Sequence, residues 1–169
     1  MDMSDKNIVL TGMPGVGKST VGVLLAKALG RYFVDTDVYM QAIQGRSLQE
    51  MIDRNGLTWF LEAEEDYVLC LDETNAVIAT GGSVVYRETA MHYLASRGIV
   101  IHLDLPVAQI EERLRNLRTR GVVMEQGQTI RSLYAQRQPL YERYAQVTID
   151  CIGKGHDQIV AEVVEMLAG

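Results

Sequence analysis

The sequence predicts an α/β fold, with a parallel five-stranded sheet that carries helices on both faces. Short apolar runs typical of buried strands alternate along the 169 residues with stretches whose apolar positions recur at helical spacing. Parallel strands need helical crossovers, and these crossovers cover both faces of the sheet. No internal repeat or linker interrupts the alternation, so we expect a single domain over residues 1–169.

The N-terminal half is expected to supply three strands. In chain order its elements are strand 7–11, a helix from Lys18 to Leu29, strand 32–35, a helix from Ser47 toward Arg54, helix 57–71 and strand 76–80. Ser47 and Glu50 have the spacing of a capping box, which marks the start of a helix. Trp59, in the next helix, is expected to pack or to line the site.

The C-terminal half is expected to add two strands. Its elements are helix 87–96, strand 98–103, a helix from Pro106 through Leu114, helix 130–144, strand 147–151 and helix 159–167. Pro106 suits the first turn of a helix, where its missing N–H costs nothing. Residues 121–128 show no clear periodicity of apolar residues, so no helix or strand is expected there.

One segment carries a specific chemical motif. Residues 12–19 read G-M-P-G-V-G-K-S, which matches G-x-x-x-x-G-K-[ST], and they lie between a strand and a helix as this motif requires. The glycines let backbone N–H groups approach phosphate oxygens, and the following helix directs its positive end at them. Lys18 would reach the β- and γ-phosphates, and the Ser19 hydroxyl would ligate Mg²⁺.

Two further segments follow strands directly and should lie beside this loop. Ligands of open parallel sheets bind at the carboxyl ends of the strands. Asp35 and Asp37 flank one residue at such an end, so one could hold Mg²⁺ and the other accept a proton, although Asp37 could simply cap the next helix. Gly81 and Gly82 follow the third strand and would permit close approach to a ligand, or form only a turn.

Arginines form two candidate anion sites. A basic stretch precedes the aperiodic segment, and its members are Arg113, Arg115, Arg118 and Arg120. They could be solvated cations favoured by the helix dipole, or one of them could cover a transferred phosphoryl group. Arg137, in R-Q-P-L-Y-E, could face solvent or grip an anion.

The net charge and the composition limit which kinds of partner we expect the protein to bind. The net charge of −6 argues against nucleic acid. Two cysteines without paired spacing, a polar N-terminus and no long apolar stretch favour a reduced, cytoplasmic chain that does not bind membranes.

Together these pieces resemble the shikimate kinase family. The matches occur in order over nearly the whole chain: G-M-P-G-V-G-K-S-T-V-G, F-V-D-T-D, G-R-S-L-Q-E-M-I, T-G-G, R-x-P-L-Y-E and V-T-I-D. The resemblance implies a three-layer P-loop kinase fold like that of nucleoside monophosphate kinases, with acceptor-binding helices over 37–72 and a lid over 117–128. It implies a monomer that transfers the γ-phosphoryl group of ATP to the 3-hydroxyl of shikimate with Mg²⁺, a step toward the aromatic amino acids.

The resemblance also implies residue roles. The residues expected to bind ATP are Gly15, Val16, Gly17, Lys18, Ser19, Thr20, Arg113, Arg120 and Lys154. Ser19 and Asp35 would hold Mg²⁺. The acceptor would be bound by Asp37, Gly81, Gly82 and Arg137, with Arg137 on the carboxylate. Lys18, Asp37 and the lid arginine Arg120 would be catalytic.

Three departures from the family pattern fall on the acceptor half and the lid. The family's F-R-x-x-E has leucine at Leu61 in place of a carboxylate-binding arginine, while Glu64 remains. Ser83 replaces a third glycine, and the lid pattern R-P-L-L is R-G-V-V from Arg120. A kinase for a different small polyhydroxy acceptor is therefore an alternative, and a nucleotide-binding regulator without turnover is a second.

Overall fold

The computed structural model describes residues 6–116 and 122–169. It confirms the predicted sheet of parallel strands, in the order β2-β3-β1-β4-β5. The strands are β1 (Asn7–Thr11), β2 (Tyr32–Asp35), β3 (Ala76–Ala79), β4 (Gly98–Asp104) and β5 (Val147–Asp150). All residues of β1 and β3 are buried, which accounts for their unbroken apolar character.

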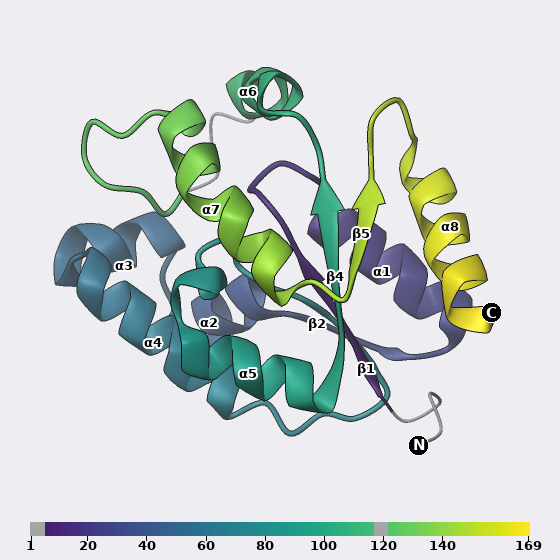
Figure 1. Cartoon of the computed structure of the whole chain (residues 1–169). Helices are drawn as coiled ribbons and strands as arrows, with labels where there is room; N and C mark the ends of the chain where they lie inside the picture. The colour runs from purple at the N-terminus through teal and green to yellow at the C-terminus, as the bar shows by residue number, and fades with distance from the viewer. Residues whose placement is uncertain (1–5, 117–121) are drawn as a thin grey trace.

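Helices cover both faces of this sheet (Figure 1). Those N-terminal to β3 are α1 (Lys18–Leu29), α2 (Thr36–Gln44), α3 (Leu48–Asn55) and α4 (Leu57–Leu69). The rest are the 3₁₀ turn η2 (Val84–Tyr86), α5 (Glu88–Arg97), α6 (Val107–Asn116), α7 (Ile130–Tyr144) and α8 (His156–Ala168). α1 and α8 pack side by side on one face, and α5 and α7 pack against the other. α2, α3 and α4 extend beyond the sheet toward one side.

Two hydrophobic clusters hold these layers. The larger one spans the sheet and the helices on both faces. The smaller one joins α2, α3 and α4 to the segment after α6, and its buried members are Met40, Leu48, Met51, Phe60 and Val123. These three helices therefore have a core of their own and are positioned partly by Val123.

The strand order brings three strand ends together. β1 lies in the middle of the sheet, β3 is its neighbour and β2 follows at the edge. Because all strands are parallel, the segments after β1, β2 and β3 emerge at the same edge. This arrangement confirms the expectation that the glycine loop, the D-T-D segment and Gly81-Gly82 line one crevice.

The start of α2 corrects one interpretation. The capping residue is Asp35, whose Oδ1 accepts hydrogen bonds from the backbone N–H groups of Asp37 and Val38, both at 3.1 Å. Asp37 lies in the first turn, so its carboxylate is not the cap. The capping box of Ser47 and Glu50 forms as predicted at the start of α3.

Within residues 6–116 and 122–169, no helix has both the length and the apolar character that a membrane span requires.

Candidate functional site

The loop between β1 and α1 has a backbone that only glycine accommodates. Gly12, Gly15 and Gly17 have φ values of 148°, 84° and 107°. A Cβ on Gly12 would stand 2.6 Å from the carbonyl oxygen of Leu103. α1 then begins at Lys18 without a side-chain cap, so its first N–H groups are available to an anion.

Two cations hold this loop through its carbonyl oxygens. The Lys18 ammonium donates to the carbonyls of Gly12 and Met13 at 2.7 and 2.9 Å. Arg113, from α6, donates through Nη1 to the carbonyls of Gly15 and Val16 at 3.2 and 3.1 Å. Both side chains therefore stabilise the loop and place positive charge beside it.

The two residues predicted to hold Mg²⁺, Ser19 and Asp35, are hydrogen-bonded to each other. The Ser19 hydroxyl donates to Oδ2 of Asp35 at 2.5 Å, while the two α2 N–H groups fix the other carboxylate oxygen. A hydroxyl and a carboxylate are hard oxygen donors that suit Mg²⁺. Among the described residues no group of three or more His, Cys, Asp or Glu side chains could hold a metal ion. An ion held by Ser19 and Asp35 would therefore take further ligands from phosphate and water.

A crevice of about 350 Å³ joins the loop to the ends of β2 and β3. Its lining includes Gly15, Gly17, Lys18, Ser19, Asp35, Asp37, Thr80 and Gly82. The Gly81 N–H donates to the Thr36 hydroxyl oxygen at 3.0 Å, and the Tyr141 hydroxyl donates to the Gly82 carbonyl at 2.6 Å. The structure thus brings half of the predicted site residues into the lining of one cavity.

Arg137 lies buried next to this crevice, with 1% of its surface exposed. Its Nε donates to the Tyr86 hydroxyl at 3.2 Å, its Nη2 donates to the Val123 carbonyl, and its guanidinium lies 5.2 Å from the centre of the Tyr86 ring. A Cβ on Gly82 would come within 2.9 Å of Nη1. Gly82 is therefore needed for the close approach of Arg137, which excludes the solvent-facing interpretation.

Glu64 is buried at the same place without an ion-pair partner among the described residues. The Ser83 hydroxyl donates to its Oε2 at 2.7 Å, and its Oε1 accepts no hydrogen bond. Burial raises the pKa of Glu64 to about 8, with a further increase from Asp37; Ser83, Arg137 and Lys18 act in the opposite direction. One departure from the family pattern, Ser83, is thus bonded to this side chain.

Leu61, three residues before Glu64, faces a separate apolar hollow of about 220 Å³. The hollow is lined by Leu57, Leu61, Tyr86, Val123, Met124, Glu125, Gln128, Leu133 and Gln136. It adjoins Arg137 because Tyr86 and Val123 are hydrogen-bond partners of that arginine. The position that carries an arginine in the family pattern is therefore part of an apolar wall.

Some predicted residues are not placed in the crevice. Arg120 lies outside the described residues, as does part of the lid expected over 117–128. The Lys154 ammonium pairs with Glu162 at 2.5 Å, and Thr20 is an exposed residue of α1. His156 was not predicted, yet a Cβ on Gly17 would stand 3.1 Å from its Nε2, so the first residue of α8 lies against the loop.

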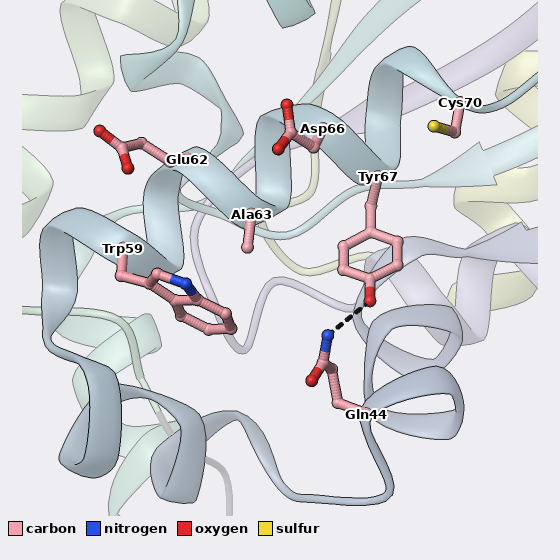
Figure 2. A pocket seen from close by; sticks show the side chains of 7 residues that line it. All are labelled: Gln44, Trp59, Glu62, Ala63, Asp66, Tyr67 and Cys70. Atoms are coloured by element: carbon pink, nitrogen blue, oxygen red, sulfur yellow. Dashed lines mark hydrogen bonds between the residues drawn. The ribbon is translucent and has the colours of Figure 1, made fainter.

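Trp59 does not line the crevice. It borders a hollow of about 340 Å³ on α4, with Gln44, Glu62, Ala63, Asp66, Tyr67 and Cys70 (Figure 2). The Gln44 amide donates to the Tyr67 hydroxyl at 2.7 Å. In Figure 2 the indole and phenol rings flank Ala63, while the two carboxylates lie on the other side of the helix ribbon. Of the two roles expected for Trp59, the structure therefore supports packing, since the side chain lies against the smaller hydrophobic cluster.

Sequence reasoning missed the groups that support Arg137 and Glu64. Tyr86 belongs to η2 and Ser83 is the residue before it, and this short turn has no periodic pattern that would predict their contacts. Tyr141 could have been found, because it lies four residues after Arg137 and thus on the same helix face.

Known proteins match this chain over nearly its whole length. Residues 14–168 match the family model described as shikimate kinase. The shikimate kinase of Caldanaerobacter subterraneus subsp. tengcongensis is 36% identical over 165 residues, covering 94% of each chain. That of Thermodesulfovibrio yellowstonii is 34% identical over 163 residues, covering 95% of this chain and 94% of the relative. The structure of shikimate kinase from Acinetobacter baumannii in complex with shikimate is similar with a TM-score of 0.91 at 28% identity, covering 98% of this chain and 94% of that one.

Proposed function

The chain belongs to the shikimate kinase family and is an ATP-dependent kinase, and we propose that it transfers the γ-phosphoryl group of ATP to the 3-hydroxyl of shikimate. The observation that carries the proposal is the convergence of the glycine loop, Asp37 and Arg137 around Gly82. Such a site holds phosphates at one end and an anionic hydroxy compound at the other.

Each end has a distinct task. Lys18 and the first N–H groups of α1 neutralise phosphate charge, which rises in the transition state. Arg137 holds the acceptor carboxylate through a charge-assisted hydrogen bond. Asp37, whose side chain lines the crevice between these ends, accepts the proton of the attacking hydroxyl.

Ser19 and Asp35 would hold Mg²⁺, which when bound would neutralise charge on the β- and γ-phosphates. We assign Arg113 and Lys154 to the nucleotide end. Arg113 supports this assignment by its bonds to the loop carbonyls.

We further propose a single kinase domain in which α2, α3 and α4 form the acceptor side and 117–128 the lid that brings Arg120 over the phosphates. Residues 122–128 support this arrangement, since the Val123 carbonyl already bonds Arg137. The protein would act as a cytoplasmic monomer on a small molecule, with neither nucleic acid nor membrane as partner. Light scattering on the purified chain tests the oligomeric state.

A second candidate acceptor class follows from Leu61. The missing arginine removes one charge-assisted hydrogen bond to a carboxylate, which is worth about 1.5–3 kcal/mol or roughly 10–150-fold in affinity. The hollow beside Leu61 is apolar, so it favours an acceptor whose facing surface is apolar. An acceptor whose carboxylate needs a second arginine at this position would fit it less well. A kinase of another small polyhydroxy compound is therefore the alternative.

An acceptor panel tests the proposal directly. ADP release is followed with ATP, Mg²⁺ and either shikimate, quinate or simple polyols, and ³¹P NMR locates the new phosphoester. We expect kcat/KM to be highest for shikimate, with the phosphate on its 3-hydroxyl. A different acceptor with a kcat/KM at least tenfold higher would replace shikimate as the substrate and leave the kinase assignment intact.

A further inference from the structure

Glu64 occupies an unusual position for a carboxylate. It lies on the inner face of α4 with 3% of its surface exposed, one helical turn after Leu61. A Cβ on Gly81 would stand 2.3 Å from its Oε1 and 2.7 Å from Oδ1 of Asp37, so both oxygens approach the same point beside Gly81, the residue between Thr80 and Gly82 of the crevice lining. Two carboxylates therefore face each other beside the acceptor site.

Within residues 6–116 and 122–169, the groups around Glu64 do not supply an ion-paired cation. Asp37 faces it from α2, Lys18 from α1, and Arg137 and Tyr141 from α7. Two of the Arg137 nitrogens bond Tyr86 and Val123, and the Lys18 ammonium bonds the carbonyls of the loop. From the described part of the chain, Glu64 receives a hydrogen bond from the hydroxyl of Ser83, the residue before η2.

This environment disfavours an ionised Glu64. A buried carboxylate without a bonded cation takes up a proton rather than remain charged, and a like charge nearby adds to the effect. Protonation also gives the unbonded Oε1 a hydrogen to donate toward Asp37 or the acceptor. The hydroxyl of Ser83 can donate to the neutral acid as well as to the anion, so this contact persists in both forms.

We propose that Glu64 is a specificity-determining residue that stays protonated at neutral pH, so that an anionic acceptor meets a neutral acid beside Arg137 instead of a second carboxylate charge. The acceptor part of this inference rests on the proposed function. It accounts jointly for two departures from the family pattern. Leu61 takes away the cation that would ionise Glu64, and Ser83 provides a neutral hydrogen bond in its place.

The consequence is a dependence of acceptor affinity on pH. Because the pKa of Glu64 is raised to about 8, the carboxyl group is mostly protonated at pH 7 and mostly ionised above pH 8. Ionisation would then place a negative charge near the acceptor carboxylate and partly offset Arg137. Acceptor affinity should fall with pH, whereas kcat at saturating acceptor should fall much less.

Glu64→Gln tests this directly, because the amide has the size of the protonated acid and keeps both a donor and an acceptor. For the wild type we expect the KM of shikimate at pH 9 to be about tenfold that at pH 7, as expected one unit above the controlling pKa. Glu64→Gln should keep the pH 7 value and show no such increase. Glu62→Gln, which removes an exposed carboxylate of the same helix, is the matched control and should follow the wild type.

A direct titration tests the protonation of Glu64 independently of which acceptor the protein uses. With ¹³C-carboxyl glutamate, the resonance that is missing in Glu64→Gln should titrate near pH 8 in the protein without substrates. A midpoint below pH 6, or KM profiles that coincide in wild type and Glu64→Gln, would overturn the inference. If shikimate is not phosphorylated at any pH while this resonance titrates near pH 8, the protonated acid is supported and the proposed acceptor is wrong.

Discussion

The proposed nucleotide side and the proposed acceptor side meet at Gly82 but are built from different parts of the chain. The nucleotide side is made largely of backbone, since glycines with positive φ shape the loop and both Lys18 and Arg113 bind its carbonyl oxygens. The acceptor side depends on side-chain pairs between distant elements, such as Ser83 with Glu64 and Arg137 with Tyr86.

This difference explains where the chain departs from its family's pattern. A backbone cradle for phosphate requires the glycines and the lysine, and these are all present. A site made of paired side chains can change its charge when one partner is substituted, because the other partner then takes up or releases a proton. Leu61 and Ser83 both lie on the acceptor side, so variation there would change acceptor preference while phosphate binding stays constant.

The largest expected effect is on the nucleotide side. Lys18→Ala should abolish phosphoryl transfer, a loss of roughly 10³-fold or more in kcat, because it removes the charge that stabilises the developing phosphate oxygens. The measurement is steady-state ADP release, with circular dichroism to verify the fold. Lys27→Ala, at the exposed last turn of the same helix, is the control. Wild-type turnover in purified Lys18→Ala would refute the phosphate-loop assignment.

Asp37→Asn probes the point where the two sides meet. We expect kcat to fall by about 10²–10⁴-fold with little change in ATP affinity, because the amide cannot accept the hydroxyl proton. Titration calorimetry of an ATP analogue measures affinity, and Asp66→Asn, an exposed carboxylate of α4, is the control. Loss of ATP affinity with unchanged acceptor kinetics would instead assign Asp37 to the metal and reverse the roles of the two aspartates.

Leu61→Arg reintroduces a cation on the acceptor side. If shikimate is the acceptor, its KM should fall about tenfold, as for one recovered charge-assisted hydrogen bond, and Glu64 one turn away can orient the new guanidinium. The same cation should lower the pKa of Glu64 and remove the alkaline increase in KM. Leu61→Met is the control for volume. A shikimate KM that is already low and unaffected by the arginine would show that the loss at Leu61 is compensated.

The smallest effect concerns stability. In the folded protein the pKa of Glu64 is raised to about 8, whereas in the unfolded chain this carboxyl has its ordinary pKa of 4.5. Between these values the native state binds one more proton, so the free energy of unfolding falls as pH rises. Relative to Glu64→Gln, the wild type should lose a few degrees of Tm, on the order of 5 °C, between pH 5 and pH 8. If the Tm of the wild type and of Glu64→Gln changed with pH in parallel, this would contradict a raised pKa for Glu64.

The comparison with Glu64→Gln is needed because another buried group acts in the opposite direction. Burial lowers the pKa of His102. The unfolded chain therefore binds more protons at that histidine in mildly acidic solution, which makes the free energy of unfolding rise with pH there. Both proteins contain His102, so the difference between their Tm curves isolates Glu64.

The fold could be predicted because its elements are encoded locally. Each buried strand is a short apolar run, and the capping box of Ser47 and Glu50 fixes the start of α3. Periodicity gave no bounds for α2, which only the resemblance implied within 37–72, because α2 is short and follows the D-T-D segment directly, where one aspartate serves as both cap and proposed metal ligand. Helix boundaries near polar termini differed by a few residues, as at His156, where α8 begins before its first apolar position.

The sequence by itself determined the order of strands and helices along the chain, the phosphate loop and the position of the two aspartates at the end of β2. These features depend on periodicity, glycine spacing and capping, which act over a few residues of chain. Only the tertiary structure decided that Arg137 is buried at Gly82, that Glu64 has a serine and an aspartate as neighbours, and that Leu61 faces an apolar hollow. The physical reason is that the charge state of a buried carboxyl depends on every group packed around it, and for Glu64 those groups come from elements far apart in the sequence.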